Sequence, residues 1–418
     1  MIKIMKKFNL NIRLIFVFIF LFILYHSSFT TSARADTKFF QFTSIDTMKY
    51  SRDSARANLS AKTMDDQISR IAKTGSTHVA IGTPYDEEFY PVLKQWVTEV
   101  RKFHLHVWFR GNFSGWENWF DYPKTVTREK HTQKLKSFLT THPDLFESGD
   151  IFVSCPECEN GGPGDPRMKG DVNGFRQFLI SEKQTADQIF ASQGKDIQTG
   201  YYSMNGDVAR LVMDKATTKA LGGTVTIDHY VATPEKLYND ILEIAKNSGG
   251  KIILGEFGAP IPDIQGDLNE DQQADWVERA LEKVVDSQQV IGMNYWVGFG
   301  GSTHLWNDDK SARKVATSLT NVYSPKVFEG TILDQFGNGI AANVHVYGKT
   351  INTGGDGKFE LPIAKMAVLS IVADGYSTVN TTIYRSQSKG IFSMAKYRPT
   401  IFDKLKSMLS CFIVFCKN

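Results

Sequence analysis

Cysteine is scarce in this sequence, which has four among its 418 residues. They form two close pairs, Cys155 with Cys158 and Cys411 with Cys416. Four cysteines are too few for a chain of this length to depend on a disulfide framework. An extracellular setting would still permit a disulfide within either pair, so both pairs stay open at this point.

A hydrophobic run long enough to span a membrane is missing near the N-terminus. The apolar segment 14–25 falls short of the ~20 residues that a spanning helix needs. Basic residues precede it, and small or polar residues follow it as far as Ala35. This order predicts a secretory signal peptide over residues 1–35, cleaved before Asp36, and therefore a secreted or cell-surface protein. An uncleaved membrane anchor is the alternative.

An excess of charge of one sign is absent from the mature chain. Residues 1–35 hold five basic side chains and no acidic ones, so their removal changes the formal net charge from +3 to −2. The basic character of the whole chain thus belongs largely to the export signal. Charge gives no reason to expect a nucleic acid partner, and we predict none.

What is present, from Asp36 to Tyr323, is an alternation of short β-branched or aromatic runs with longer segments of helical spacing. The predicted strands are residues 39–45, 77–82, 106–111, 150–156, 196–203, 224–231, 251–258 and 290–297. The predicted helices include 64–73, 89–103, 271–285 and 312–323, with helix starts at Asp207, Thr233-Pro234 and Asn269. Such alternation implies parallel strands joined by crossover helices.

Eight strand–helix repeats favour a closed barrel over residues 36–324. The alternative is an open doubly wound sheet, which usually carries a glycine-rich nucleotide-binding turn after its first strand. That turn is missing here, because the first predicted strand leads into DTMKYSRDSA (46–55). The predicted fold class is therefore α/β, a (β/α)8 TIM barrel followed by a small all-β sandwich.

The sandwich is predicted over residues 325–395, beyond the boundary marked by Ser324-Pro325. Short alternating runs between Gly-, Asn- and Asp-rich turns indicate antiparallel strands. The phrases GTILDQFGNGI, TGGDGKFEL and VADGY resemble the carboxypeptidase regulatory-like (transthyretin-like) module. That resemblance implies an accessory or spacing domain. The remaining tail, 396–418, is basic and then apolar, which would allow association with a cell surface.

Candidate site residues follow the ends of the predicted barrel strands, because barrels of this type form their sites at the carboxyl ends of the strands. The candidates are Arg110 and Trp116 after strand three, Glu157, Glu159 and Asn160 after strand four, His229 and Tyr230 after strand six, Glu256 on strand seven, and Asn294 and Trp296 on strand eight. Structural roles are the alternatives, in particular packing for Trp116 and a core position for His229. Glutamates on strands four and seven can face each other across the barrel mouth, at the ~5–5.5 Å that retaining glycoside hydrolysis requires.

The run IILGEFG (252–258) resembles the seventh strand of the retaining clan A glycoside hydrolases, especially family 5. The resemblance implies that Glu256 is the nucleophile. Strand four, ending in Glu157, aligns without gaps with the family pattern I-F-x-x-x-Asn-Glu, which implies that Glu157 is the general acid and base. His229 or Tyr230 is similar to the substrate-binding residue of strand six, and Trp296 to the tryptophan under the reacting sugar.

Two positions depart from the family pattern. Pro156 stands where an asparagine normally precedes the acid/base residue. The usual arginine near strand two is absent from residues 78–85, and Arg110 on strand three is its predicted substitute.

Two questions remain open within SCPECENGG (154–162). Glu157 is preferred over Glu159 as the acid/base residue, because we expect it on the rigid end of the strand and Glu159 on the turn. A zinc site would need two more soft ligands than Cys155 and Cys158 supply, and a redox pair would need a thioredoxin-like context. We therefore predict no metal, and read the thiols as wall residues or a local disulfide.

The sequence as a whole predicts a secreted retaining glycoside hydrolase that cleaves a β-linked polysaccharide or oligosaccharide with two glutamates. No cofactor is implied. The alternative is a non-catalytic, glycan-binding cell-surface protein built on the same barrel.

Overall fold

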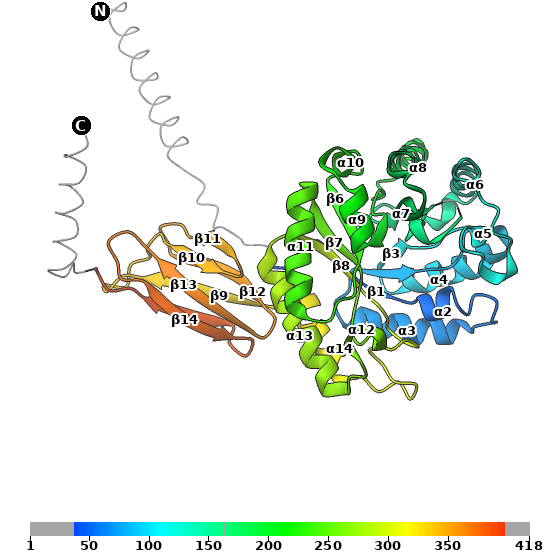
Figure 1. Ribbon diagram of the computed structural model, residues 1–418. Helices are drawn as coiled ribbons and strands as arrows, with labels where there is room; N and C mark the ends of the chain where they lie inside the picture. The colour runs from blue at the N-terminus through cyan, green and yellow to red at the C-terminus, as the bar shows by residue number, and fades with distance from the viewer. Residues whose placement is uncertain (1–36, 163, 398–418) are drawn as a thin grey trace, which may run out of the picture.

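Eight parallel strands, surrounded by helices, form the larger part of the protein in the computed structural model (Figure 1). The structure describes residues 37–162 and 164–397, so the predicted signal peptide and nearly all of the predicted tail lie outside the described residues. The strands are β1 (Phe42–Asp46), β2 (His78–Ile81), β3 (His106–Phe109), β4 (Ile151–Phe152), β5 (Ser203–Asn205), β6 (Thr224–Asp228), β7 (Lys251–Phe257) and β8 (Val290–Tyr295).

The strands are hydrogen-bonded in the order β4-β3-β2-β1-β8-β7-β6-β5. The sheet closes on itself between β4 and the chain that leads into β5. There Ile151 forms a parallel bridge with Gln198, and the Phe152 amide donates to the Gln198 carbonyl at 2.8 Å. The predicted (β/α)8 fold class is confirmed, and the open-sheet alternative is wrong.

The fifth strand differs from its predicted position at 196–203. The chain touches the sheet at Gln198, leaves it, and returns as β5 only at Ser203. Gly200 explains the interruption, because its φ of +87° lies in the left-handed region and bends the chain out of an extended conformation.

Helices follow the strands and cover the outside of the barrel (Figure 1). The longer helices are α3 (Ala61–Lys73), α4 (Tyr90–Lys102), α6 (Arg128–Thr141), α8 (Val172–Ser192), α9 (Gly206–Val212), α10 (Lys215–Ala220), α11 (Pro234–Ser248), α13 (Glu270–Ser287) and α14 (Lys314–Tyr323). The short ones are α2 (Met48–Ser51), η1 (Glu87–Phe89), α5 (Ser114–Glu117), η2 (Trp119–Asp121), η3 (Pro143–Leu145), η4 (Cys158–Asn160), α7 (Pro166–Lys169) and α12 (Pro262–Gln265). Within the described residues, no helix has both the length and the apolar character needed to cross a membrane.

The predicted helix starts have local causes. Thr233 accepts a hydrogen bond from the Lys236 amide, and Pro234 occupies the first turn of α11. Asn269 forms a capping box with Gln272 at the start of α13. The start predicted at Asp207 lies one residue late, because α9 begins at Gly206.

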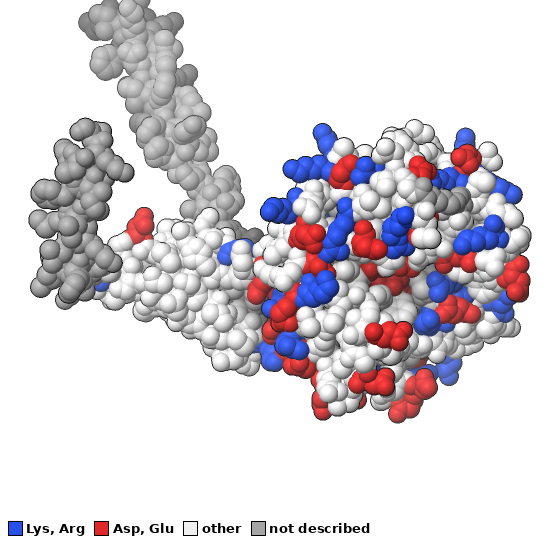
Figure 2. Space-filling view, in the orientation of Figure 1, with Lys and Arg blue, Asp and Glu red and all other residues white. Residues whose placement is uncertain are grey.

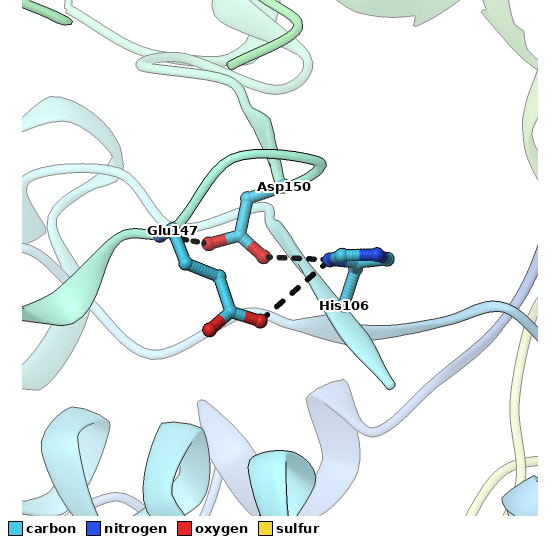
Figure 3. A group of neighbouring side chains, drawn as sticks. All are labelled: His106, Glu147 and Asp150. Carbon is cyan, nitrogen blue, oxygen red and sulfur yellow. Dashed lines mark hydrogen bonds and ion pairs between the residues drawn. The ribbon is translucent and has the colours of Figure 1, made fainter. Parts of the chain in front are cut away.

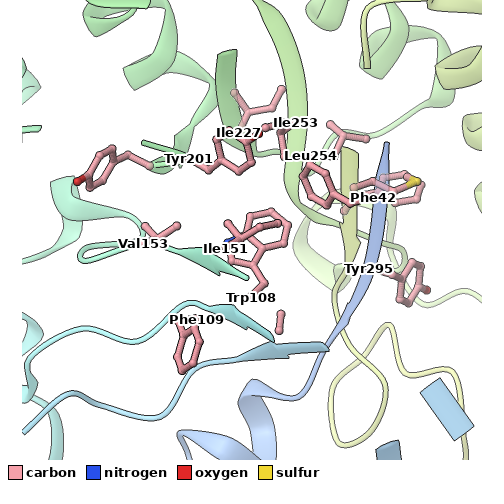
Figure 4. Close-up of a cluster of buried hydrophobic side chains, with 14 of the residues drawn as sticks. Phe42, Trp108, Phe109, Ile151, Val153, Tyr201, Ile227, Ile253, Leu254 and Tyr295 are labelled. Carbon is pink, nitrogen blue, oxygen red and sulfur yellow. The ribbon is translucent and has the colours of Figure 1, made fainter. Parts of the chain in front are cut away.

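Large side chains fill the inside of the barrel, so it is a packed core (Figure 4). Phe42 of β1 lies edge-to-face with Trp108 of β3, with ring centroids 5.5 Å apart. It also stacks on Tyr201 at 5.8 Å. A Cβ at Gly292 would lie 2.2 Å from the Phe42 ring, so the close approach of β8 to this ring requires glycine. Function is therefore confined to the ends of the strands.

The C-terminal part is a two-sheet sandwich. Its strands are β9 (Lys326–Leu333), β10 (Asn343–Val346), β11 (Lys349–Asn352), β12 (Lys358–Ile363), β13 (Met366–Val372), β14 (Val379–Tyr384) and β15 (Lys389–Ser393). One sheet has the order β11-β10-β13-β14 and the other β12-β9-β15. The pairing is antiparallel as predicted except that β15 runs parallel to β9, because its pairing partner is the first strand of the module rather than a neighbour in a hairpin. The face of the sandwich seen in Figure 2 carries few charged side chains, whereas positively and negatively charged side chains are both spread over the barrel.

The sandwich contacts the end of the barrel opposite to the strand ends that carry the candidate residues. Gln288, just before β8, donates to the Tyr347 carbonyl at 2.8 Å. Arg385 donates to the carbonyl of Ser324, just after α14, at 2.9 Å. Lys365 and Glu278 form an ion pair across the same junction. The sandwich therefore leaves the barrel mouth uncovered.

Candidate active site

Glu256 lies on β7 with both carboxylate oxygens engaged by side-chain donors. Arg110 Nη2 donates to Oε1 at 2.9 Å, and the Tyr230 hydroxyl donates to Oε2 at 2.9 Å. The residue is 7% exposed. Two donors from different strands thus fix the orientation of this carboxylate.

Arg110, which directly follows β3, is a buried guanidinium shared by three carboxylates. Besides Glu256, it donates to Asp228 Oδ2 at 3.1 Å, and its Nε lies 3.6 Å from Asp46 Oδ2. Its Nη1 donates to the Gly255 carbonyl at 2.5 Å, which ties it to the β7 backbone. The predicted substitute for the missing strand-two arginine therefore contacts the predicted nucleophile directly.

Burial governs the protonation of this group. It raises the pKa of Asp46 and of Asp228, and the charge of Arg110 opposes both shifts. Burial also raises the pKa of Glu256 to about 8, with Asp228 adding to the rise and Arg110 opposing it. One guanidinium cannot neutralise three buried carboxylates, so the group retains protons at neutral pH.

Asn294 lies beneath this cluster rather than at its surface. Its side-chain amide donates to Asp46 Oδ2 and to the Gly255 carbonyl, each at 2.9 Å. It is fully buried. A residue predicted to bind substrate thus orients Asp46 and the β7 backbone in this structure.

Glu157 lies beside Glu256 at the mouth of the barrel. Burial raises the pKa of Glu157 well above its usual range. The negative charges of Glu256 and then Asp228 are the next largest causes of this rise. The Glu157 amide donates to the Ser203 carbonyl at 2.8 Å, and its carboxylate accepts from Asn160 Nδ2 at 3.1 Å. Fewer donors meet this carboxylate than meet Glu256, so Glu157 is the better placed of the two to hold a proton.

Glu157 does not continue a strand, in contrast to the prediction. β4 ends at Phe152, and Glu157 lies in a left-handed turn (φ +47°) just before η4. Pro156 has no amide hydrogen, so the chain cannot continue the ladder of hydrogen bonds through this position. The rigidity of this residue therefore comes from its turn.

Glu159 lies in a buried position and contacts the backbone of β5. It accepts from the Asn205 amide at 2.7 Å and is 2% exposed. Burial raises its pKa to about 7. The hydrogen bond from the Asn205 amide to the Glu159 side chain holds η4 against β5.

Tyr230 and Trp296 are partly exposed at the same end of the barrel. Their rings lie edge-to-face with centroids 5.9 Å apart. Lys49 Nζ lies 5.5 Å from the centroid of the Trp296 ring. Asn160 is exposed, and its hydrogen bond to Glu157 places it near the same end of the barrel. These three predicted residues remain available to a molecule at the barrel mouth.

His229 and Trp116 lie outside this group. His229 Nε2 lies 2.8 Å from Asp240 Oδ2, toward α11, and burial lowers the pKa of His229. Trp116 has no exposed surface, donates to the Cys158 carbonyl at 3.2 Å, and stacks on Phe178 at 5.7 Å. The structure therefore gives both residues packing roles, because their contacts turn them away from the barrel mouth.

Three acidic residues of the site were not among the predicted residues. Asp46 and Asp228 are the last residues of β1 and β6, so the strand-end criterion that singled out Glu256 also covers them. Glu117, in α5, is one of the residues whose charge raises the pKa of Glu157. Burial raises the pKa of Glu117 itself to about 7. Glu117 directly follows the predicted residue Trp116, but no motif distinguishes it from the other acidic residues of the chain.

Cys155 and Cys158 form a disulfide with an S–S distance of 2.01 Å. Disulfide sulfurs have no thiolate to offer to zinc. The pair therefore takes one of the two roles left open by the sequence, a local disulfide in the wall of the site.

One cluster of metal-ligand type occurs among the described residues, formed by His106, Glu147 and Asp150 (Figure 3). It lies at the amino end of β3, away from Glu256. Arg101 pairs with Glu147 at 3.1 Å and with Asp150 at 2.6 Å. Asp150 also accepts from the Val107 amide at 2.9 Å. Through these contacts the carboxylates of Glu147 and Asp150 hold β3 against the start of β4.

No protein-family model matches the chain, and no curated protein matches it. Among solved structures, a variant of a GH5_18 enzyme from Bifidobacterium longum subsp. longum, in complex with Manβ1-4GlcNAc, is similar with a TM-score of 0.51 and 14% identity over 72% of this chain and 84% of that chain. GH5_18 from Streptomyces cattleya, in complex with GlcNAc, has a TM-score of 0.53 and 13% identity over 72% and 85%. The chain shares the barrel fold of family 5, clan A glycoside hydrolases. The predicted resemblance is confirmed at the level of the fold.

Proposed function

We propose that the protein is a retaining glycoside hydrolase with Glu256 as nucleophile and Glu157 as general acid and base. The observation that carries the proposal is the unequal environment of the two carboxyl groups. Arg110 and Tyr230 donate to the two oxygens of Glu256 and oppose the rise in its pKa that burial causes, so Glu256 is the more readily ionised of the two glutamates. Glu157 lies within the field of that charge, which favours its protonated form.

The first step breaks the glycosidic bond. Glu256 attacks the anomeric carbon while Glu157 transfers its proton to the departing oxygen, which leaves a glycosyl ester on Glu256. In the second step Glu157 takes a proton from water as the water oxygen attacks the anomeric carbon. The ester bond breaks, Glu256 is released as a carboxylate, and the sugar leaves with its original anomeric configuration. The chain's own residues suffice for both steps.

The partly exposed residues are the proposed sugar contacts. The Trp296 ring offers an apolar face for a pyranose ring, and Tyr230 and Asn160 offer polar groups beside Glu256 and Glu157. Arg110 and Asn294 act through Glu256 and Asp46, so their proposed role is positioning rather than sugar binding. Glu159 acts in the same indirect way through the Asn205 amide.

A β-linked oligosaccharide or polysaccharide is the proposed substrate. The shared fold with enzymes whose structures contain Manβ1-4GlcNAc and GlcNAc supports this class. A screen of purified β-linked glycans and aryl β-glycosides, with those two sugars among the first ligands, would identify the sugar.

Covalent labelling tests the mechanism. A 2-deoxy-2-fluoro glycoside with an activated leaving group should accumulate as an ester, and peptide mass spectrometry should locate it on Glu256. Glu256→Ala should abolish both labelling and turnover. A protein that turns over substrate without labelling, or retains activity as Glu256→Ala, would contradict the proposal.

The rival function is glycan binding without catalysis at the cell surface. Pro156 in place of the usual asparagine favours it slightly, and the retained carboxyl pair disfavours it. A protein that binds glycans but neither reacts with the fluoroglycoside nor cleaves any glycan in the screen would support the rival.

We further propose that the mature protein starts at or near Asp36 and is exported, with the sandwich as an accessory domain and the tail at the cell surface. N-terminal sequencing of the exported protein tests the first part. An intact Met1 on a membrane-bound protein would instead indicate an anchor.

A further inference from the structure

Glu157 lies inside a four-residue loop whose two ends, Cys155 and Cys158, are joined by a disulfide. The hydrogen bond found at its carboxylate comes from the exposed side chain of Asn160. Glu256, by contrast, is fixed through both of its oxygens by Arg110 and Tyr230. The position of Glu157 therefore depends on the backbone of its loop.

That backbone has a conformation that glutamate disfavours. Glu157 has φ +47° and ψ +46°, in the left-handed region, where the Cβ of a non-glycine residue crowds the following carbonyl oxygen. Such a conformation persists only where neighbouring contacts impose it. Two backbone hydrogen bonds supply these contacts. The Glu157 amide donates to the Ser203 carbonyl at 2.8 Å, and the Asn160 amide donates to the Glu157 carbonyl at 2.9 Å.

The first half of the disulfide is anchored in a buried polar chain beneath the loop. Cys155 is fully buried, and Asn112 Nδ2 lies 3.4 Å from its Sγ. The other side-chain atom of Asn112, Oδ1, lies 2.8 Å from His131 Nε2. His131 Nδ1 in turn lies 3.0 Å from Glu182 Oε2. This chain holds Cys155 to α6 and α8.

The second half is anchored by an indole. Cys158 is 2% exposed, and its carbonyl accepts from Trp116 Nε1 at 3.2 Å. A Cβ at Gly161 would lie 1.8 Å from Trp116, which shows how closely the loop packs on this ring. The disulfide thus joins two fixed points and holds Glu157 between them.

We infer that the Cys155–Cys158 disulfide positions Glu157 for proton transfer, and that opening it impairs this transfer while leaving the attack of Glu256 intact. The inference deepens the proposed function and rests on it. It assigns Cys155 and Cys158 as positioning residues. A dithiol reductant would supply the two electrons and two protons that turn the disulfide into two thiols, and would itself become a cyclic disulfide.

The test uses the full mature chain carrying Cys411→Ser and Cys416→Ser, so that the pair at 155 and 158 is the one that responds. Oxidised and dithiothreitol-reduced forms, and the Cys155→Ser/Cys158→Ser variant, are assayed on aryl β-glycosides of graded leaving-group pKa. With poor leaving groups we expect kcat/KM to fall by about 10–100-fold, because general acid catalysis contributes about 10²–10⁴-fold. With activated leaving groups we expect less than about a threefold change. Reoxidation should restore the oxidised profile.

Alkylation before and after reduction, followed by peptide mass spectrometry, shows which thiols have formed. Free thiols at Cys155 and Cys158 before reduction would overturn the inference, as would full alkylation with an unchanged leaving-group dependence. Equal losses with all leaving groups, accompanied by a lower Tm, would show a purely structural role and would also overturn it. If the oxidised protein neither cleaves activated glycosides nor takes the fluorosugar label, the proposed function itself fails, which is a separate outcome.

Discussion

Arg110 connects the acidic residues of the site to one another. It contacts Glu256, Asp228 and Asp46 from a position that is 1% exposed. A buried carboxylate that loses its cation keeps its desolvation cost without compensation. The site therefore depends on this residue for the charge state of the proposed nucleophile as well as for its orientation.

Replacing Arg110 by methionine should cost about 3–5 kcal/mol of stability and lower kcat/KM by at least about 100-fold. Because Arg110 opposes the rise in the pKa of Glu256, its loss should also move the acidic limb of the pH–rate profile to higher pH. Thermal unfolding and pH–rate profiles measure these effects. Arg56→Met is the matched control, since Arg56 pairs with Glu88 on the surface; similar losses in that variant would argue against a specific role for Arg110.

Glu157 and Glu159 should differ sharply when each is replaced by alanine. Glu157→Ala should slow substrates with poor leaving groups by about 10²–10⁴-fold and spare activated aryl glycosides, because the latter need little protonation. Azide should restore turnover by attacking the glycosyl ester on Glu256. Glu159→Ala should show neither effect, since Glu159 points to the Asn205 amide. The opposite pattern would move the acid/base role to Glu159.

Glu117 makes stability depend on pH. Burial raises its pKa from 4.5 to about 7, so between these values the native state binds more protons than the unfolded state. Stability from this group therefore falls as pH rises from 4.5 to 7. Glu117→Gln should raise the free energy of unfolding at pH 8 by up to about 3 kcal/mol and change it little at pH 4. Urea unfolding at both pH values measures the difference, and an equal effect at both would contradict it.

The barrel strands supply most of the site as consecutive ends of one sheet. Asp46 comes from β1, whereas Asp228 and Glu256 come from the neighbouring strands β6 and β7, which lie far from β1 in the sequence. β4 is the exception, because it stops at Phe152 and the chain turns before Glu157. The element that carries the proposed acid/base residue is thus a disulfide-closed turn.

Helix α13 covers β7 and β8 and depends on its N-terminal capping box. The Asn269 side chain accepts from the Gln272 amide at 2.9 Å, and the Gln272 side chain accepts from the Asn269 amide at 3.0 Å. Asn269→Ala should lower the free energy of unfolding by about 1 kcal/mol. Asn247→Ala, an exposed position inside α11, is the control. A loss no larger than that of the control, measured by urea unfolding, would show that the box contributes little.

At the scale of the whole molecule, barrel and sandwich have separate hydrophobic cores. The contacts between them are partly polar, such as those of Gln288 with Tyr347 and of Arg385 with Ser324. They are also partly apolar, because the Tyr347 ring lies edge-to-face with Phe39 at 5.3 Å and Ala364 packs against the barrel core. They lie at the end of the barrel away from Glu256. The end of the barrel that carries Glu256 is therefore assembled without the sandwich.

A chain that ends at Ser324 should fold and retain its turnover of soluble substrates within about twofold, because the barrel has its own core. Its Tm is expected to fall modestly, since the polar contacts at the junction and the packing of Tyr347 and Ala364 on the barrel are lost. Kinetics on a soluble aryl glycoside, with a polysaccharide in parallel, measure the effect. A truncated protein that is folded but inactive on the soluble substrate would show that the sandwich is more than an accessory.

The sequence by itself determined the repeating pattern and the strand-end residues. Apolar runs such as 251–258 are buried on both faces, and that property is legible from composition alone. The cap residues Thr233 and Asn269 accept hydrogen bonds from amides three positions further along the chain, so they too can be predicted from the sequence. Glu256, Glu157, Arg110 and Tyr230 could be named in advance because they lie at or after the ends of the predicted strands, where barrels of this type form their sites.

Only the tertiary structure decided how those residues are used. Whether a strand-end side chain faces the barrel mouth, as Tyr230 does, or a helix, as its neighbour His229 does, depends on partners distant in sequence. The sharing of Arg110 among Asp46, Asp228 and Glu256 likewise arises because the curvature of the barrel brings the ends of β1, β6 and β7 around the guanidinium that follows β3. Long-range contacts of this kind leave no periodic signal in the chain, so the charge state of the site follows from the fold.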